Sequence, residues 1–178
     1  MNRTGSVAFR GVDTLARAAN NAPMTDEWKL PWEGGCRCGE VRVRVTKAPL
    51  LAGACHCTGC QKMSASAYSL SLAIPGDGFE VVSGEPVRGG AGGPPQRHFH
   101  CPRCKSWMFT RVEGLDWFVN LRATMLDDHG WYEPFVELWA GEKLPWAATG
   151  AIHSYETVPE MSAFEALMAE YAVKGRRP

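Results

Sequence analysis

The amino-acid sequence predicts a mostly β domain with a short C-terminal helix. Three observations support this fold class. Several stretches alternate apolar and polar residues, which is typical of half-buried strands. Turns containing Gly, Pro and Asp separate those stretches. Only one stretch, near the end of the chain, carries apolar residues at helical spacing. With 178 residues, the chain is long enough for one domain with a sizeable core.

The clearest strand is Glu40–Thr46, which reads EVRVRVT. Its alternation predicts one buried valine face and one solvent-exposed face that carries Arg42 and Arg44. The other predicted strands, in chain order, cover residues 68–74, 79–82, 107–111, 117–121 and 134–138. The Gly- and Pro-rich segment 88–95, RGGAGGPP, disfavours both helix and strand, so we expect a mobile loop there.

The predicted helix covers residues 161–174, which read MSAFEALMAEYAVK. Ser162 is a suitable N-cap residue for it. Four apolar side chains share one face of this helix: Phe164, Leu167, Met168 and Tyr171. We expect this face to pack on the sheet.

Composition excludes some classes of partner. Lys plus Arg total 19 and Asp plus Glu total 19, so the net charge is zero and nothing attracts nucleic acid in general. No apolar stretch approaches the roughly 20 residues needed to span a bilayer. We therefore expect neither a nucleic acid nor a membrane as partner.

The polar N-terminal part of the chain differs from the patterned remainder. We predict a disordered extension over residues 1–29 and a single zinc domain over residues 30–174. The first residues lack the continuous apolar core of a secretory signal. The chain also has an odd number of cysteines, 7, which would leave one thiol over in a disulfide framework. A cytoplasmic protein with reduced cysteines is the expectation.

The cysteines fall into three groups whose members are only one or two residues apart. These groups are Cys36 and Cys38, then Cys55, Cys57 and Cys60, then Cys101 and Cys104. Cysteines so close together rarely form a disulfide with each other, but they can share one metal ion. Zinc takes about four ligands in a tetrahedron, with sulfur near 2.3 Å. The spacing therefore predicts zinc–thiolate sites.

The spacing is compatible with one closed site and one open site. The two outer pairs can together supply four thiolates, which leave no open position, whereas the middle group supplies three, as in catalytic zinc sites. Two alternatives remain open at this point. A histidine, His56, His98 or His100, could close the second site, although each is more typical of a turn or surface residue. Alternatively, the first pair could share a metal with two members of the middle group.

Four segments carry a resemblance to a known family: GGCRCGEVRVRV, CHCTGCQKMSASAY, FHCPRCKSWMF and TMLDDHGWYEPFVELWAGEKLPWA. They resemble the glutathione-dependent formaldehyde-activating enzyme family, also called the CENP-V/GFA domain. The resemblance runs from about Trp32 to Phe164. It implies an Mss4-like fold of β-sheets that binds two zinc ions. It also implies structural ligands Cys36, Cys38, Cys101 and Cys104, and catalytic ligands Cys55, Cys57 and Cys60.

The resemblance implies a carbon–sulfur lyase that joins formaldehyde to the thiol of glutathione, or reverses that step. The expected partners are thus a small thiol and a small aldehyde. Candidates to meet the carboxylates of the thiol are Lys62, Arg97, Arg103 and Arg111, each more typical of a solvated surface. The alternative is a non-enzymatic zinc module for a protein or nucleic-acid partner. Two departures from the family pattern, Gln61 in place of Arg and Ala65 in place of Gly, bear on the substrate rather than the metals.

Overall fold

The structure is a computed structural model that describes residues 28–90 and 95–178. It confirms the mostly β fold with a short C-terminal helix. The strands are β1 (Trp32–Gly35), β2 (Arg42–Val45), β3 (Leu51–Cys55), β4 (Ser69–Pro75), β5 (Phe79–Ser83), β6 (Val87–Gly89), β7 (Gln96–His100), β8 (Trp107–Val112), β9 (Phe118–Arg122), β10 (Val136–Leu138) and β11 (His153–Tyr155). The α-helices are α2 (Thr58–Ser64) and α3 (Met161–Lys174). Short 3-10 helices cover Gly76–Gly78, Ala123–Met125 and Ala140–Glu142.

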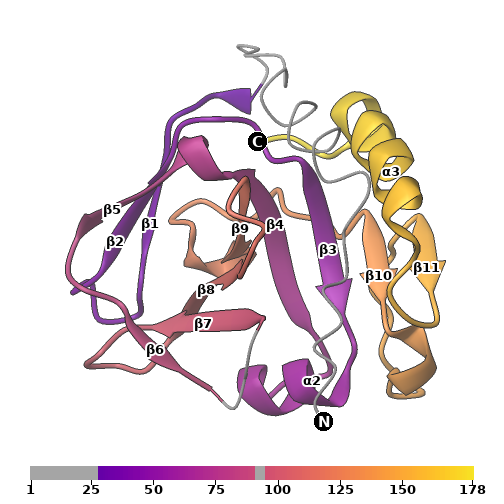
Figure 1. The fold of residues 1–178 in the computed structure, drawn as a ribbon, viewed down its shortest axis with the longest axis horizontal. Helices are drawn as coiled ribbons and strands as arrows, with labels where there is room; N and C mark the ends of the chain where they lie inside the picture. The colour runs from indigo at the N-terminus through magenta and orange to yellow at the C-terminus, as the bar shows by residue number, and fades with distance from the viewer. Residues whose placement is uncertain (1–27, 91–94) are drawn as a thin grey trace, which may run out of the picture.

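The strands form two sheets (Figure 1). The small sheet has three strands in the order β1-β2-β5, and the large one has eight in the order β11-β10-β3-β4-β9-β8-β7-β6. Neighbours pair antiparallel except at the β11-β10 and β10-β3 pairs, which are parallel. Helix α3 lies beside β10 and β11 at the edge of the large sheet, and α2 follows β3 at the other end of the molecule (Figure 1).

The predicted alternation in EVRVRVT is confirmed. Val43 and Val45 in β2 are fully buried in the core. On the other face, Arg42 donates to Asp127 at 2.9 Å and Arg44 donates to Glu33 at 2.7 Å. These two arginines are thus the wet face of a strand and are already paired with acids.

Helix α3 has the predicted bounds, 161–174, but not the predicted cap. Its N-cap residue is Glu160, whose side chain makes no capping hydrogen bond, so the assignment of Ser162 as the cap is wrong. The prediction that the apolar face of α3 packs on the sheet is confirmed. Leu167 and Tyr171 are buried in the core, and the helix contacts β3.

The sequence patterns missed several elements, including α2, β3 and β7. Strand β3 reads LAGAC and does not alternate, because it lies between β10 and β4 and α3 packs against it. A short strand also occupies part of the predicted mobile loop, since Arg88 and Gly89 belong to β6. Residues 91–94 of that loop lie outside the described residues.

The predicted N-terminal extension, residues 1–29, lies almost wholly outside the described residues, and its disorder stays a prediction. Trp28 is described and buried. Its ring packs at 6.0–6.2 Å from the rings of Trp32, Trp131 and Tyr171. Within residues 28–90 and 95–178, no helix combines the length and apolar character needed to cross a bilayer.

Gly34 in β1 allows a close approach of two backbone segments. A Cβ atom there would lie 2.4 Å from the carbonyl oxygen of Met125, which cannot move without shifting the backbone. We expect Gly34→Ala to lower the free energy of unfolding by about 1–3 kcal/mol, measured by urea unfolding. Gly130, which is exposed and has nothing within 4 Å of such a Cβ, is the control. Equal losses from Gly34→Ala and Gly130→Ala would contradict this account.

Candidate functional site

The first cysteine cluster joins two loops that are distant in sequence. The Sγ atoms of Cys36, Cys38, Cys101 and Cys104 all lie within 4.8 Å of one another. The first pair follows β1, and the second lies between β7 and β8. Gly39, with φ +78°, supplies the left-handed backbone that turns the chain back toward β2. The cluster therefore ties the small sheet to the large one.

Hydrogen bonds favour the thiolate form of Cys36 and Cys104 in this first cluster, whereas burial raises the pKa of Cys101 to about 11. The backbone N–H of Val41 donates to Cys36 Sγ at 3.3 Å. Cys104 Sγ lies 3.2 Å from the hydroxyl of Ser106, and this hydrogen bond is the main cause that lowers the pKa of Cys104 to about 5. Four clustered sulfur atoms with donors around them suit a metal cation, because a cation is needed to offset their mutual repulsion.

The second cluster lies where β3 ends and α2 begins. The Sγ atoms of Cys55, Cys57 and Cys60 lie within 4.8 Å of one another, and no His, Asp or Glu of the described chain joins them. Cys57 is the N-cap of α2, and its sulfur accepts from the backbone N–H of Cys60 at 3.4 Å. A hydrogen bond from Cys55, followed by one from Ser69, lowers the pKa of Cys60 to about 5 despite burial.

These two clusters decide between the pairings that spacing left open. The first pair shares its cluster with Cys101 and Cys104, so the alternative in which it joins the middle group is wrong. The second cluster has three sulfur atoms from a single turn of chain. Both clusters could hold a metal ion.

His56, between two cysteines of the second cluster, is wholly buried, so its prediction as a turn or surface residue is wrong. Its Nε2 lies 3.1 Å from Glu137 Oε2, and its ring meets the edge of Tyr68 at 5.2 Å. The imidazole of His56 thus pairs with Glu137. His56 does not belong to the second cluster of the described chain, so the alternative in which it closes that site is wrong. His98 is also buried, where it pairs with Thr110 at 2.8 Å.

Glu137 in β10 is the centre of a buried polar network beneath the second cluster. Besides His56, its carboxylate accepts from Lys143 at 3.0 Å, Thr149 at 2.7 Å and Ser154 at 2.9 Å. Burial alone would raise the pKa of Glu137, but these hydrogen bonds outweigh it and lower the pKa to about 2. The network holds the loop between β3 and α2 against β10.

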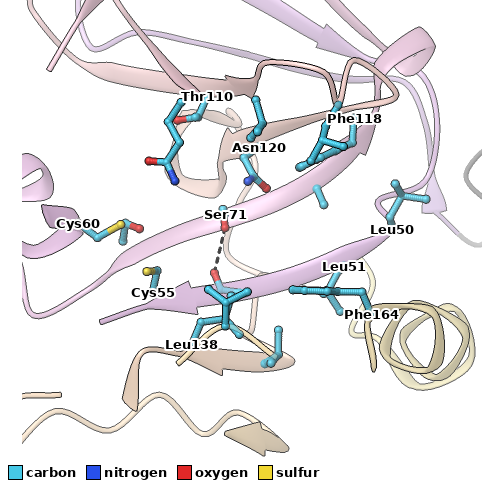
Figure 2. A pocket seen from close by; sticks show the side chains of 18 of the residues that line it. Leu50, Leu51, Cys55, Cys60, Ser71, Thr110, Phe118, Asn120, Leu138 and Phe164 are labelled. Carbon is cyan, nitrogen blue, oxygen red and sulfur yellow. Dashed lines mark hydrogen bonds between the residues drawn. The ribbon is translucent and has the colours of Figure 1, made fainter. Parts of the chain in front are cut away.

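A cavity of about 350 Å³ extends from the second cluster over one face of the large sheet (Figure 2). Alternate residues of neighbouring strands line it, because side chains of a strand point to opposite faces with period two. From β3, β4 and β9 these are Leu51, Gly53, Cys55, Ser69, Ser71, Ala73, Phe118, Asn120 and Arg122. Figure 2 shows Cys55 and Cys60 at one end and Leu50, Leu51 and Phe164 at the other.

Arg122 supplies a buried positive charge in this cavity. Its guanidinium stacks on the ring of Trp107 at 4.1 Å and donates to Ser69 Oγ at 3.2 Å. Burial lowers the pKa of Arg122 to about 10, and attraction to Cys60 and Cys55 opposes this shift. Its Nε has no hydrogen-bond partner. The side chain therefore stays charged near neutral pH and retains an unused donor.

The sequence patterns did not single out Arg122. None of the predicted candidates Lys62, Arg97, Arg103 and Arg111 lines the cavity. A signal was present, because Arg122 continues the alternation of the predicted strand 117–121 by one residue. Arg97, by contrast, lies near Asp116, with its Nη2 at 3.3 Å from the carboxylate.

Comparison with known proteins agrees with this site. The family model described as glutathione-dependent formaldehyde-activating enzyme matches residues 31–142, which hold every cysteine of both clusters. The chain belongs to this family. The match confirms the resemblance found in the sequence.

Two curated proteins bear the name of this glutathione-dependent formaldehyde-activating enzyme family. One, from Halomonas elongata, is 34% identical over 87 residues, which are 43% of this chain and 55% of that protein. The other, from Penicillium rubens, is 29% identical over 128 residues, which are 63% of this chain and 65% of that protein. The chain thus spans between half and two thirds of the length of these relatives. A crystal structure of a Rhodobacter sphaeroides protein is 15% identical with a TM-score of 0.46, covering 69% of this chain and 99% of that one.

Both departures from the family pattern lie beside the second cluster. Gln61 donates from Nε2 to the carbonyl oxygens of His56 at 2.6 Å and Glu142 at 3.0 Å. Ala65 ends α2 in the left-handed region, with φ +49°, where glycine is the favoured residue. In this family member, Gln61 therefore links α2 to the loop that carries the cysteines.

The Glu137 network predicts a pH-dependent contribution to stability. Because the pKa of Glu137 is depressed to about 2, its stabilising effect is full above the ordinary carboxyl range and is lost as the pH falls through that range toward 2. We expect Glu137→Gln to lower the free energy of unfolding by about 1–3 kcal/mol at pH 7. The difference from the unsubstituted protein should shrink below pH 4.

Urea unfolding of Glu137→Gln and of the unsubstituted protein across this pH range measures the difference in their free energies of unfolding. Protonation of the cysteines affects both proteins equally and therefore cancels in this difference. Glu165, exposed on α3, is the matched control, and Glu165→Gln should change stability by less than about 0.5 kcal/mol. A pH-independent difference between Glu137→Gln and the unsubstituted protein would exclude an ionised Glu137 as the cause.

Proposed function

We propose that this protein is a zinc-dependent carbon–sulfur lyase that forms or breaks the adduct of a glutathione-type thiol with a small aldehyde, such as S-hydroxymethylglutathione. The observation that carries the proposal is a cluster of three sulfur atoms without a fourth ligand from the described chain, in which Cys55 and Cys60 line a cavity. The two relatives named for glutathione-dependent formaldehyde activation support the same reaction class.

The donor sets fit zinc. Thiolates are ligands that zinc prefers, and each cluster places its sulfur atoms within 4.8 Å of one another, close enough to share one ion. Cys36, Cys38, Cys101 and Cys104 would hold a structural zinc and close its coordination. Cys55, Cys57 and Cys60 would hold a second zinc with a position left for substrate. When bound there, zinc lowers the pKa of a coordinating thiol and so supplies a thiolate at neutral pH.

The residues of the cavity would orient the reactants. The sulfur of the thiol would lie at the end of the cavity formed by Cys55 and Cys60. In the forward step the thiolate bonds to the carbonyl carbon, the π electrons move to the carbonyl oxygen, and that oxygen takes up the proton that the thiol lost. Arg122 would donate to this oxygen as negative charge develops on it. The reverse step breaks the carbon–sulfur bond.

The proposal extends to the domain and its setting. Residues 30–174 would form the single zinc domain, and the reduced state of all seven cysteines would suit the cytoplasm. The contrasting function is a non-enzymatic zinc module for a protein or nucleic-acid partner. A nucleic-acid partner is less well supported, because Arg42 and Arg44 already pair with acids.

Metal analysis of two cysteine variants tests the division of roles. We expect about two zinc ions per chain in the purified protein. Cys57→Ser should lose one of them and keep its circular dichroism spectrum, because the second cluster lies within one turn of chain. Cys104→Ser should lose the other and become several kcal/mol less stable, because the first cluster joins the two sheets. Equal destabilisation by Cys57→Ser and Cys104→Ser would refute the division into a catalytic and a structural site.

Exchange kinetics test the reaction. We expect the zinc-loaded protein to accelerate interconversion of formaldehyde, glutathione and their adduct, followed by NMR exchange spectroscopy. Cys57→Ser should lose this acceleration, since the proposed zinc position requires all three thiolates. Isothermal titration with glutathione at millimolar concentration is the companion measurement. If neither heat nor acceleration were observed, the non-enzymatic alternative would replace the lyase proposal.

A further inference from the structure

We propose that the cavity beside the second cluster receives the apolar body of an aldehyde larger than formaldehyde. This inference rests on the proposed lyase function and names the class of its carbonyl substrate. It follows from three features of the cavity: the gradient of polarity along it, the charges on its wall and its volume.

The polar side chains of β4 and β9 that line the cavity gather toward the sulfur end, and the other end is mainly apolar. The register of β3 with β4 places Cys55 opposite Ser69, and Leu51 opposite Ala73, four residues away along the strand. Strand β9 continues this order, because Arg122 lies opposite Ser71 and Phe118 lies opposite Pro75. On β4 and β9, the polar side chains therefore lie toward the sulfur end, where Leu138 of β10 is the apolar neighbour of Cys55, and the wall becomes apolar with distance from the cysteines.

Helix α3 completes the apolar end. Met161, Phe164 and Met168 from the helix line the cavity with Leu50 and Leu51. Figure 2 shows Phe164 beside Leu51, at the end opposite Cys55 and Cys60. Trp117, next to Phe118, adds to the lining at this end, whereas Trp139 follows Leu138, the partner of Cys55, at the sulfur end. An aldehyde of one carbon, held at the sulfur end, would leave this wall without a partner.

The charges on the wall do not match the body of glutathione. Among the described residues that line the cavity there is no Asp, Glu or Lys, and Arg122 is the one arginine. Glutathione carries two carboxylates and an ammonium group, and burial of such groups without partners is strongly unfavourable. The peptide body of the thiol would therefore lie outside the apolar end, and only its sulfur would reach the cysteines. This leaves the apolar end to the aldehyde.

Arg122 defines where the aldehyde oxygen would lie. Its side chain is only 7% exposed, and its Nε is a buried donor without a partner. Because Arg122 lines the cavity, a carbonyl oxygen, or the oxyanion derived from it, would lie beside this positive charge, with the carbon chain pointing away from Arg122. The cavity volume of about 350 Å³ lies within the range of small-molecule sites and accommodates a chain of hexanal size.

Binding of unreactive analogues tests this inference without turnover. Hexanoate combines a carboxylate for Arg122 with an apolar chain, and acetate offers the carboxylate alone. Each buried methylene strengthens binding about fourfold, so we expect hexanoate to bind the zinc-loaded full chain more than tenfold more tightly than acetate. Isothermal titration measures both, and tryptophan fluorescence from the cavity wall is a second readout. Equal affinities for hexanoate and acetate would overturn the inference.

Two variants locate the binding site. Ala73→Phe fills space beside Leu51, toward the apolar end of the cavity, and should weaken hexanoate binding about tenfold or more, whereas Ala172→Phe, on the exposed side of α3, should leave it unchanged. Met161→Glu is a second test that should still fold, because a carboxylate in the first turn of a helix is favourable. It should also weaken hexanoate binding, by repulsion at the apolar end. Unchanged hexanoate affinity in both Ala73→Phe and Met161→Glu would exclude this cavity.

Turnover separates the inference from the function on which it rests. We expect glutathione adducts of hexanal to exchange faster than those of formaldehyde, and Ala73→Phe to lower the ratio of the two rates about tenfold. Catalysis with formaldehyde but no preference for hexanal, in a protein that binds hexanoate no better than acetate, would overturn the inference and retain the lyase. Hexanoate binding without exchange of either aldehyde would refute the lyase, and with it the assignment of an aldehyde to the cavity.

Discussion

The rest of this structure depends on the crowding of sulfur atoms. Four thiols in one cluster and three in another lie within 4.8 Å of one another, and deprotonated thiols at such distances repel unless a cation lies between them. The first cluster joins the loop after β1 to the loop between β7 and β8, and so holds the two sheets of the described chain together. The second lies within a single turn of chain, so its metal would contribute chemistry rather than architecture.

Two different groups of residues surround the second cluster, the Glu137 network on one side and the cavity with Arg122 on the other. On one side, Glu137 accepts from His56, Lys143, Thr149 and Ser154, and this network holds the cysteine loop against β10. On the other side, Arg122 places a buried positive charge beside the sulfur atoms, where negative charge would develop during addition to a carbonyl. In the proposed function, the network would position the cysteines, and the cavity would select which molecules reach them.

Sequence patterns were most informative where one physical requirement dominated. The alternation in EVRVRVT predicted β2, and helical spacing predicted α3 at its observed bounds, because each has one buried and one wet face. Strand β3 escaped prediction because LAGAC lies inside the sheet with α3 packed against it, and α2 because its seven residues bury no apolar side chain. The burial of His56 was not predicted for a related reason. Its partner Glu137 lies 81 residues away in the chain, so the residues next to His56 give no sign of the pair.

The sequence by itself determined the chemistry available to this protein. Closely spaced cysteines already indicated thiolate–metal sites, because the spacing of ligands within a turn is a local property. Only the tertiary structure decided which cysteine pairs share a cluster. It also decided that His56 pairs with Glu137 and that Arg122 lies near Cys55 and Cys60. These contacts depend on strand order and register, which join residues far apart in the chain and leave no periodic trace in it.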